Sequence, residues 1–147
     1  MTKDIDLFFL CSLIEFIGRK QKLTRKDVAA SLGYDRLKHI YEYADILHCE
    51  PIAKVADEFI KICRIETGTF DNIAACKYDV PSYWDIGDVY TRLIQDIMNS
   101  RGNAKVIDTL QEIYGSWISD SISNYNSDFF YQPRDYIREC YLEGEVL

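Results

Sequence analysis

Leu23-Thr-Arg-Lys-Asp-Val-Ala-Ala-Ser-Leu-Gly-Tyr-Asp-Arg-Leu-Lys-His-Ile40 is the stretch that decides the fold. Thr24, followed three residues later by an acid, is a capping-box-like start for a short helix that ends at Gly33. Asp35 can cap the next helix, which the apolar spacing extends to about Leu47. A small residue where two helices cross and a glycine at the turn are the layout of a helix-turn-helix.

Helical spacing of apolar residues continues on both sides of this stretch. We therefore expect an all-α protein, a compact bundle of about seven helices with a helix-turn-helix-like N-terminal part. Trp117 is expected on the inward face of the sixth helix. The connector over 70–80 is expected to be ordered, with a short helix around 72–76. The expected helices span 4–20, 24–33, 35–47, 51–62, 82–100, 106–118 and 133–142.

The chain divides by charge near residue 66. Residues 1–66 hold equal numbers of basic and acidic side chains, whereas residues 67–147 carry the whole net charge of −7. Glu66-Thr-Gly-Thr69 interrupts the helical pattern at the same place. We expect an N-terminal helical module over 1–66 and an acidic C-terminal helical part over 67–147 packed against it. An acidic surface repels phosphate and suits a basic protein surface.

Composition excludes several classes of protein. Hydrophobic residues make up 48% of the chain, enough for a core, yet no apolar run is long enough to span a membrane. The apolar segment Leu7–Leu13 has acids before it rather than the basic start of an export signal, so we expect a cytoplasmic protein. The five cysteines are scattered without any C-x-x-C pair, which indicates reduced thiols. No metal and no cofactor is expected.

Catalytic motifs do not stand out. The sequence contains no G-x-S-x-G, P-loop, H-E-x-x-H or G-x-G-x-x-G motif. His48 and Cys49 are adjacent, but neighbouring helical side chains point about 100° apart and do not form a dyad. Asp85 and Asp88 share the polar side of an amphipathic helix, where solvated carboxylates are expected. These patterns favour a binding protein over an enzyme.

DNA binding is the alternative that the helix-turn-helix layout raises. Five basic residues between Arg19 and Lys26, just before and at the start of the helix-turn-helix-like stretch, can contact phosphates. The expected recognition helix, 35–47, also exposes Glu42 and Asp45, and it holds almost none of the side chains that read guanine or adenine edges. DNA is therefore a partner that we do not favour. The candidate DNA-binding residues are Arg19, Lys20, Lys22, Arg25, Lys26, Arg36 and Lys38.

The N-terminal module also resembles a family of small bacterial proteins. Phe8-Phe-Leu-Cys-Ser-Leu-Ile-Glu-Phe16, Leu23-Thr-Arg-Lys-Asp-Val28 and Tyr43-Ala-Asp-Ile-Leu-His48 are similar to motifs of the DUF3791 family. The resemblance covers about residues 4–62. Members of that family tend to be encoded beside DUF3990 proteins, which resemble ADP-ribosyltransferases, an arrangement typical of toxin–antitoxin modules. The resemblance implies a bacterial antitoxin-like protein and carries over no catalytic residue.

Aromatic side chains gather in two loops of the acidic part. One group flanks Pro81 and the other surrounds Pro133. Tyrosine and phenylalanine on loops are common anchors of protein interfaces, although aromatic residues also close the ends of helical bundles. The candidate partner-binding residues are Asp128, Phe129, Phe130, Tyr131, Asp135 and Tyr136.

Two functions follow from these patterns, and they can coexist. The leading one is a non-enzymatic protein-binding component of a toxin–antitoxin-type module, the antitoxin or immunity partner of an ADP-ribosyltransferase-like toxin encoded nearby. The alternative is a helix-turn-helix transcriptional regulator. An enzyme of unrecognised type is a third class without a motif to support it, and self-association remains open.

Overall fold

The computed structural model of the protein describes residues 2–103 and 105–147, with side chains from residue 5 onward. Within these ranges all regular structure is helical, which confirms the all-α prediction. No helix in the described part of the chain is both long and apolar enough to cross a membrane. The helices are α1 (Thr2–Gln21), α2 (Arg25–Glu42), α3 (Ala44–Leu47), α4 (Ile52–Ile62), α5 (Tyr83–Arg101), α6 (Val106–Tyr114), α7 (Trp117–Ser123), the 3-10 helix η1 (Phe129–Tyr131) and α8 (Arg134–Glu143).

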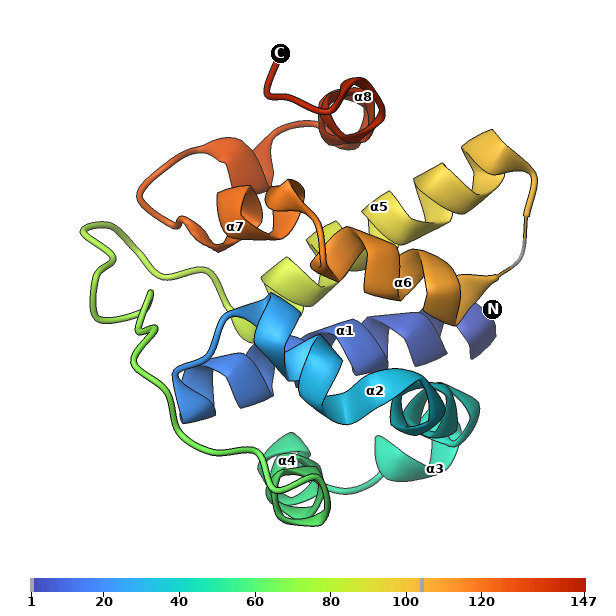
Figure 1. Ribbon diagram of the computed structural model, residues 1–147, viewed down its shortest axis with the longest axis vertical. Coiled ribbons are helices and arrows are strands. Elements are labelled where there is room, and N and C mark those ends of the chain that lie inside the picture. The colour runs from blue at the N-terminus through green and yellow to red at the C-terminus, as the bar shows by residue number, and fades with distance from the viewer. Residues whose placement is uncertain (1, 104) are drawn as a thin grey trace.

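Helix α1 runs through the middle of the molecule (Figure 1). It packs most extensively along α5 and also contacts α2, α3 and α4. In the view of Figure 1, α3 and α4 lie below α1, while α7 and α8 lie above it. The buried side chains of the two expected parts, 1–66 and 67–147, belong to one hydrophobic core. Leu10, Leu13, Ile14 and Ile17 of α1 are completely buried in it because the helix has neighbours on several sides.

The helix-turn-helix-like stretch forms two helical segments that meet at Gly33. This glycine adopts φ 75° and ψ 167°, a conformation that side chains with a Cβ rarely accept. Thr24 accepts a hydrogen bond from the backbone N–H of Asp27, as its capping position predicts. The second segment ends at Glu42 rather than continuing to Leu47, and α3 follows as a separate short helix.

The predicted end of the sixth helix, near residue 118, is wrong. Helix α6 stops at Tyr114, and the Ser116 hydroxyl accepts a hydrogen bond from the backbone N–H of Ile118, which starts α7. The break turns Trp117 away from the deepest core, so this side chain is only half-buried while Ile118 is fully buried. The short helix expected around 72–76 is absent, and residues 72–75 form a turn instead.

Helix α5 follows the sequence signals at both ends. Ser82 and Asp85 form a reciprocal capping box, in which each side chain accepts a hydrogen bond from the other residue's backbone N–H. Gly102 ends the helix in a left-handed conformation with φ 62°. The capping box fixes where α5 begins and Gly102 fixes where it ends. Residues of α5 form one wall of a surface recess.

Candidate functional site

A surface recess lies between α5 and the segment that leads from η1 into α8. It encloses about 310 Å³. One wall is formed by Val89 and Leu93 of α5, and the opposite wall by residues of η1 and α8. Concave sites with apolar walls and a few polar groups are the usual form of binding sites in proteins. The apolar lining comprises Pro81, Val89, Leu93, Phe130, Tyr131 and Ile137.

The aromatic residues of η1 differ in their accessibility. Tyr131 is 68% exposed. Phe130 is half-buried, and its ring meets Tyr125 at 5.7 Å and Tyr131 at 4.9 Å between centroids, both edge-on. Phe129 points inward and is only 5% exposed. A partner can therefore reach Tyr131 and the edge of Phe130, whereas Phe129 belongs to the core.

A second recess borders the other side of Phe130 and Tyr131. Tyr78 and Asp79 of the connector and Asp128 before η1 line it. Tyr78 is among the most exposed aromatic side chains of the described residues. We call the combined area the aromatic–acidic surface. It consists of Tyr78, Asp79, Asp85, Asp128, Phe130 and Tyr131.

The aromatic–acidic surface holds an excess of negative charge. Arg92, in the first recess, pairs with Asp88 at 3.0 Å. Arg134, which lines the same recess, forms a two-pronged pair with Asp96, with N–O distances of 3.0 and 2.7 Å. Among the described residues, no cation lies within ion-pair distance of Asp79, Asp85 or Asp128. These three exposed carboxylates line the two recesses that Tyr131 borders, and the described residues offer none of them a basic partner.

The last two candidate partner-binding residues lie on α8. Asp135 is exposed and pairs with Arg138 at 3.3 Å. Tyr136 is half-buried, and its hydroxyl donates to the carbonyl of Leu147. The structure therefore brings Asp128, Phe130 and Tyr131 together, while Asp135 and Tyr136 lie outside both recesses.

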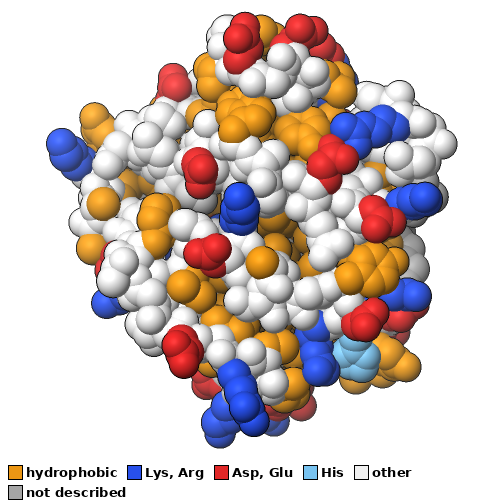
Figure 2. Space-filling view, in the orientation of Figure 1, with side chains coloured by type: hydrophobic (Ala, Val, Ile, Leu, Met, Phe, Trp, Pro, Cys, Tyr) orange, Lys and Arg blue, Asp and Glu red, His pale blue; other side chains and the backbone are white. Residues whose placement is uncertain are grey.

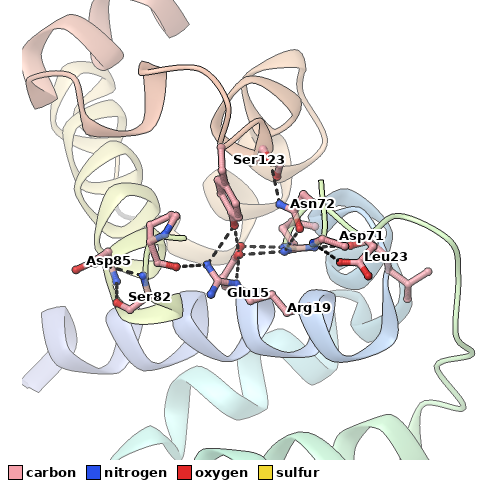
Figure 3. Close-up of polar contacts among 12 residues, drawn as sticks. Glu15, Arg19, Leu23, Asp71, Asn72, Ser82, Asp85 and Ser123 are labelled. Carbon is pink, nitrogen blue, oxygen red and sulfur yellow. Dashed lines mark hydrogen bonds and ion pairs between the residues drawn. The ribbon is translucent and has the colours of Figure 1, made fainter. Parts of the chain in front are cut away.

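Beneath this surface lies a buried ionic cluster that the sequence did not reveal. The Glu15 side chain is 1% exposed, and Arg25 donates to both its oxygens, at 2.8 and 3.0 Å. Arg25 also donates to the side chain of Asn72 at 3.1 Å, and Asn72 donates to the carbonyl of Ser123 at 2.9 Å. Figure 3 shows these contacts linking α1 to Asn72 of the connector and to Ser123 of α7.

The charges of this cluster stabilise one another. Burial alone would raise the pKa of Glu15, but the hydrogen bonds and charge of Arg25, with the charge of Arg19, outweigh it and hold this pKa below its ordinary value. Burial and the Glu15 charge raise the pKa of Tyr125 to about 12. Its hydroxyl therefore stays protonated and donates to Glu15. Glu15 is thus held as an ion by three neighbouring donors.

Arg25 cannot serve in the DNA contacts that its position in the sequence suggests, because it is fully buried. Arg19 is 17% exposed and is bonded to Glu15. Lys20 pairs with Asp57, and Lys22 lies 3.9 Å from Asp71. Of the seven candidates, the described residues leave these without a carboxylate partner: Lys26, Arg36 and Lys38.

Acidic and basic side chains are interspersed over most of the face drawn in Figure 2. Acidic side chains lie at the top, over α8, and Lys and Arg side chains gather at the lower edge, over α4. The candidate residues Lys26 and Lys38 share α2 with Asp27, Asp35 and Glu42, all exposed. The helix that would enter a DNA groove therefore carries acids among its bases.

We expect weak and nonspecific DNA binding at most. Three free basic residues give a slope of about −3 in a log–log plot of affinity against salt concentration, since each phosphate contact contributes about −0.9. The measurement is fluorescence anisotropy of a labelled duplex at several salt concentrations, with Lys26, Arg36 and Lys38 together replaced by Ala as the control. Tight binding at physiological salt that is lost in this triple variant would instead support the DNA-binding hypothesis.

No protein family, curated protein or solved structure matches this chain.

Groups suited to metal chemistry are not assembled in the described part of the chain. No three His, Cys, Asp or Glu side chains there are placed to share a metal ion. His48 is exposed and its Nδ1 lies 3.0 Å from the carbonyl of Ala44 in its own helical turn. The five cysteines are free thiols, and burial raises the pKa of Cys11 to about 12. A buried thiol with so high a pKa is a poor nucleophile.

One sequence signal for the buried cluster exists. Glu15 interrupts the apolar stretch of α1, with Ile14 before it and Ile17 shortly after, and a lone acid among buried positions needs a cation. Several arginines and lysines follow within a few residues, so the sequence does not say which one is the partner. The choice of Arg25 depends on how α2 packs across α1.

Proposed function

We propose that the protein is a non-enzymatic binding protein that takes a basic segment of a partner protein on its aromatic–acidic surface. The observation that carries this proposal is the exposed Tyr131 ring beside Asp79, Asp85 and Asp128, none of which has a basic partner among the described residues. An arginine or lysine placed over the ring would meet both its π face and the carboxylates. The aliphatic part of the same side chain would pack in the recess.

The two kinds of side chain on this surface have different tasks. Carboxylates with no internal partner attract an oppositely charged protein over several ångströms and speed association. Aromatic rings in a recess lose water on contact and supply most of the lasting affinity. The whole-chain net charge of −7 adds to the attraction for a basic partner.

The partner that we propose is the toxin of a two-gene module, for which this chain acts as the antitoxin or immunity protein. The support for this narrower proposal is the resemblance of residues 4–62 to proteins encoded beside ADP-ribosyltransferase-like toxins. A binding protein that occludes a toxin needs an accessible docking surface and no catalytic residues of its own. The aromatic–acidic surface provides such an area.

Association and dissociation should respond to different substitutions. Asp79→Lys with Asp128→Lys should slow association with the neighbouring toxin, whereas Tyr131→Ala should speed dissociation and cost about 2 kcal/mol of binding free energy, as expected for a hot spot. Surface-binding kinetics measure both rates. Tyr43→Ala is the matched control, because Tyr43 is another exposed tyrosine, 49% exposed, on the N-terminal part.

Circular dichroism should show that each variant stays folded. Dissociation from Tyr131→Ala at the wild-type rate, together with a loss of binding in Tyr43→Ala, would place the interface on the N-terminal part and reject the aromatic–acidic surface. Phe130→Ala is less suitable as a first test, because Phe130 also packs against Tyr125.

A further inference from the structure

We infer that Arg19 is a positioning residue that holds both sides of the recess beside Tyr131. The inference rests on the proposed function, since it concerns the shape of the same docking surface. Arg19 lies in the last turn of α1 and does not line the recess itself. It acts through two contacts that reach different segments of the chain.

The first contact fixes the segment that precedes α5. A terminal guanidinium nitrogen of Arg19 donates to the carbonyl of Pro81 at 2.7 Å. Pro81 lines the recess and lies directly before Ser82, the residue that caps α5. A charged donor at this distance makes a stronger hydrogen bond than a neutral one. Arg19 therefore sets where this rim of the recess lies relative to α1.

The second contact fixes the opposite rim. The same nitrogen lies 3.4 Å from the Tyr125 hydroxyl, and the guanidinium lies 5.4 Å from the centre of the Tyr125 ring. The Tyr125 ring meets Phe130 edge-on, and Phe130 meets Tyr131 in the same way. The position of the exposed Tyr131 ring is thus linked through two aromatic contacts to Arg19.

Arginine has a specific advantage at this position. Its Nε donates to Glu15 at 2.8 Å while the terminal nitrogen reaches Pro81 and Tyr125, so one planar group serves both directions. A lysine would keep the charge but present a single nitrogen, which cannot occupy both donor positions. Lys20, the next residue, pairs with Asp57 of α4 and touches neither rim. It offers a matched control with the same change of charge.

The first arm of the test measures the free protein. Amide hydrogen exchange is compared among wild type, Arg19→Met, Arg19→Lys and Lys20→Met. We expect Arg19→Met to speed exchange in residues 78–83 and 125–131 while α4 and α6 keep their protection, with Arg19→Lys intermediate and Lys20→Met like wild type. Unchanged exchange in both segments, or equal acceleration throughout the chain, would overturn the positioning role.

The second arm measures binding of a fluorescein-labelled nona-arginine peptide, with Tyr131→Ala included. We expect Arg19→Met to weaken binding about tenfold, which is the size of effect expected from the loss of one charged hydrogen bond. Arg19→Lys should recover part of the affinity. If Tyr131→Ala weakens binding and Arg19→Met does not, the inference about Arg19 is overturned and the docking surface stands. If Tyr131→Ala binds as wild type does, the docking surface is rejected, and the role of Arg19 in shaping it falls too.

Discussion

Arg25→Met is expected to lower the free energy of unfolding by about 3–5 kcal/mol, because it leaves the charge of a buried carboxylate without its main partner. Glu15 and Arg25 are both buried, and their two-pronged contact satisfies both carboxylate oxygens. Methionine fills similar volume but donates nothing. Asn72 would also lose the donor to its side-chain oxygen. Urea-induced unfolding followed by circular dichroism measures the loss.

Lys26→Met is the matched control for this substitution, since Lys26 is the exposed neighbour and its replacement should leave stability nearly unchanged.

The pH dependence of the free energy of unfolding distinguishes loss of the ion pair from loss of packing. In the wild type the pKa of Glu15 is lowered, so its contribution to stability is present above the ordinary value of 4.5 and is lost as the pH falls through the folded-state pKa. In Arg25→Met, burial raises the pKa of Glu15, so this carboxyl group takes up a proton as the pH falls. The variant then no longer has to bury an unpaired negative charge. The deficit should therefore shrink between pH 7 and pH 4, and a constant deficit would contradict this explanation.

Gly87→Val is expected to cost about 3 kcal/mol, because α1 and α5 approach too closely there to admit a side chain. A Cβ atom at Gly87 would lie 2.9 Å from the backbone nitrogen of Ser12 and 3.0 Å from its Cα. Backbone atoms of a central helix cannot move aside as the tip of a long side chain can. The pair α1 and α5 would have to separate along the largest helix contact of the described structure.

Gly87→Ala should lower the stability less than Gly87→Val does. Its better helix propensity offsets about 1 kcal/mol of the strain, so the order of stability is wild type, Ala, Val. Asn99→Val is the control on an exposed position of the same helix. Thermal unfolding checks the series, and a Gly87→Val protein as stable as the control would show that the two helices are not packed as closely as described.

Elements with local signals were predicted well from the sequence. Thr24 caps α2, Ser82 and Asp85 form the capping box of α5, and Gly33 separates two helical segments. Each of these features depends on side chains and backbone groups within a few residues, so the local sequence contains the whole cause. The apolar spacing of α1 and α5 likewise follows from the helical period.

Errors occurred where a local signal was weak or a distant contact decided the result. The apolar stripe through Tyr114 and Trp117 predicted a continuous helix, but Ser116 starts a new one. Phe129 and Phe130 are adjacent and alike in sequence, yet the first is buried and the second reaches the surface. The distinction depends on where α5, α7 and α8 lie around η1, which the residues of η1 do not encode by themselves.

The helical class, most helix starts and stops, and the concentration of acidic and aromatic residues in 67–147 all follow from the amino-acid sequence. Helix packing is what makes Arg25 the buried partner of Glu15 and what brings Arg19 to Pro81 and Tyr125. It also leaves Tyr131 exposed in recesses whose carboxylates Asp79, Asp85 and Asp128 have no basic partner among the described residues. The two groups of features differ in the range of the interactions that cause them. Caps and helical periodicity act over one or two turns, whereas these contacts join residues up to 106 positions apart and exist only after the helices have packed.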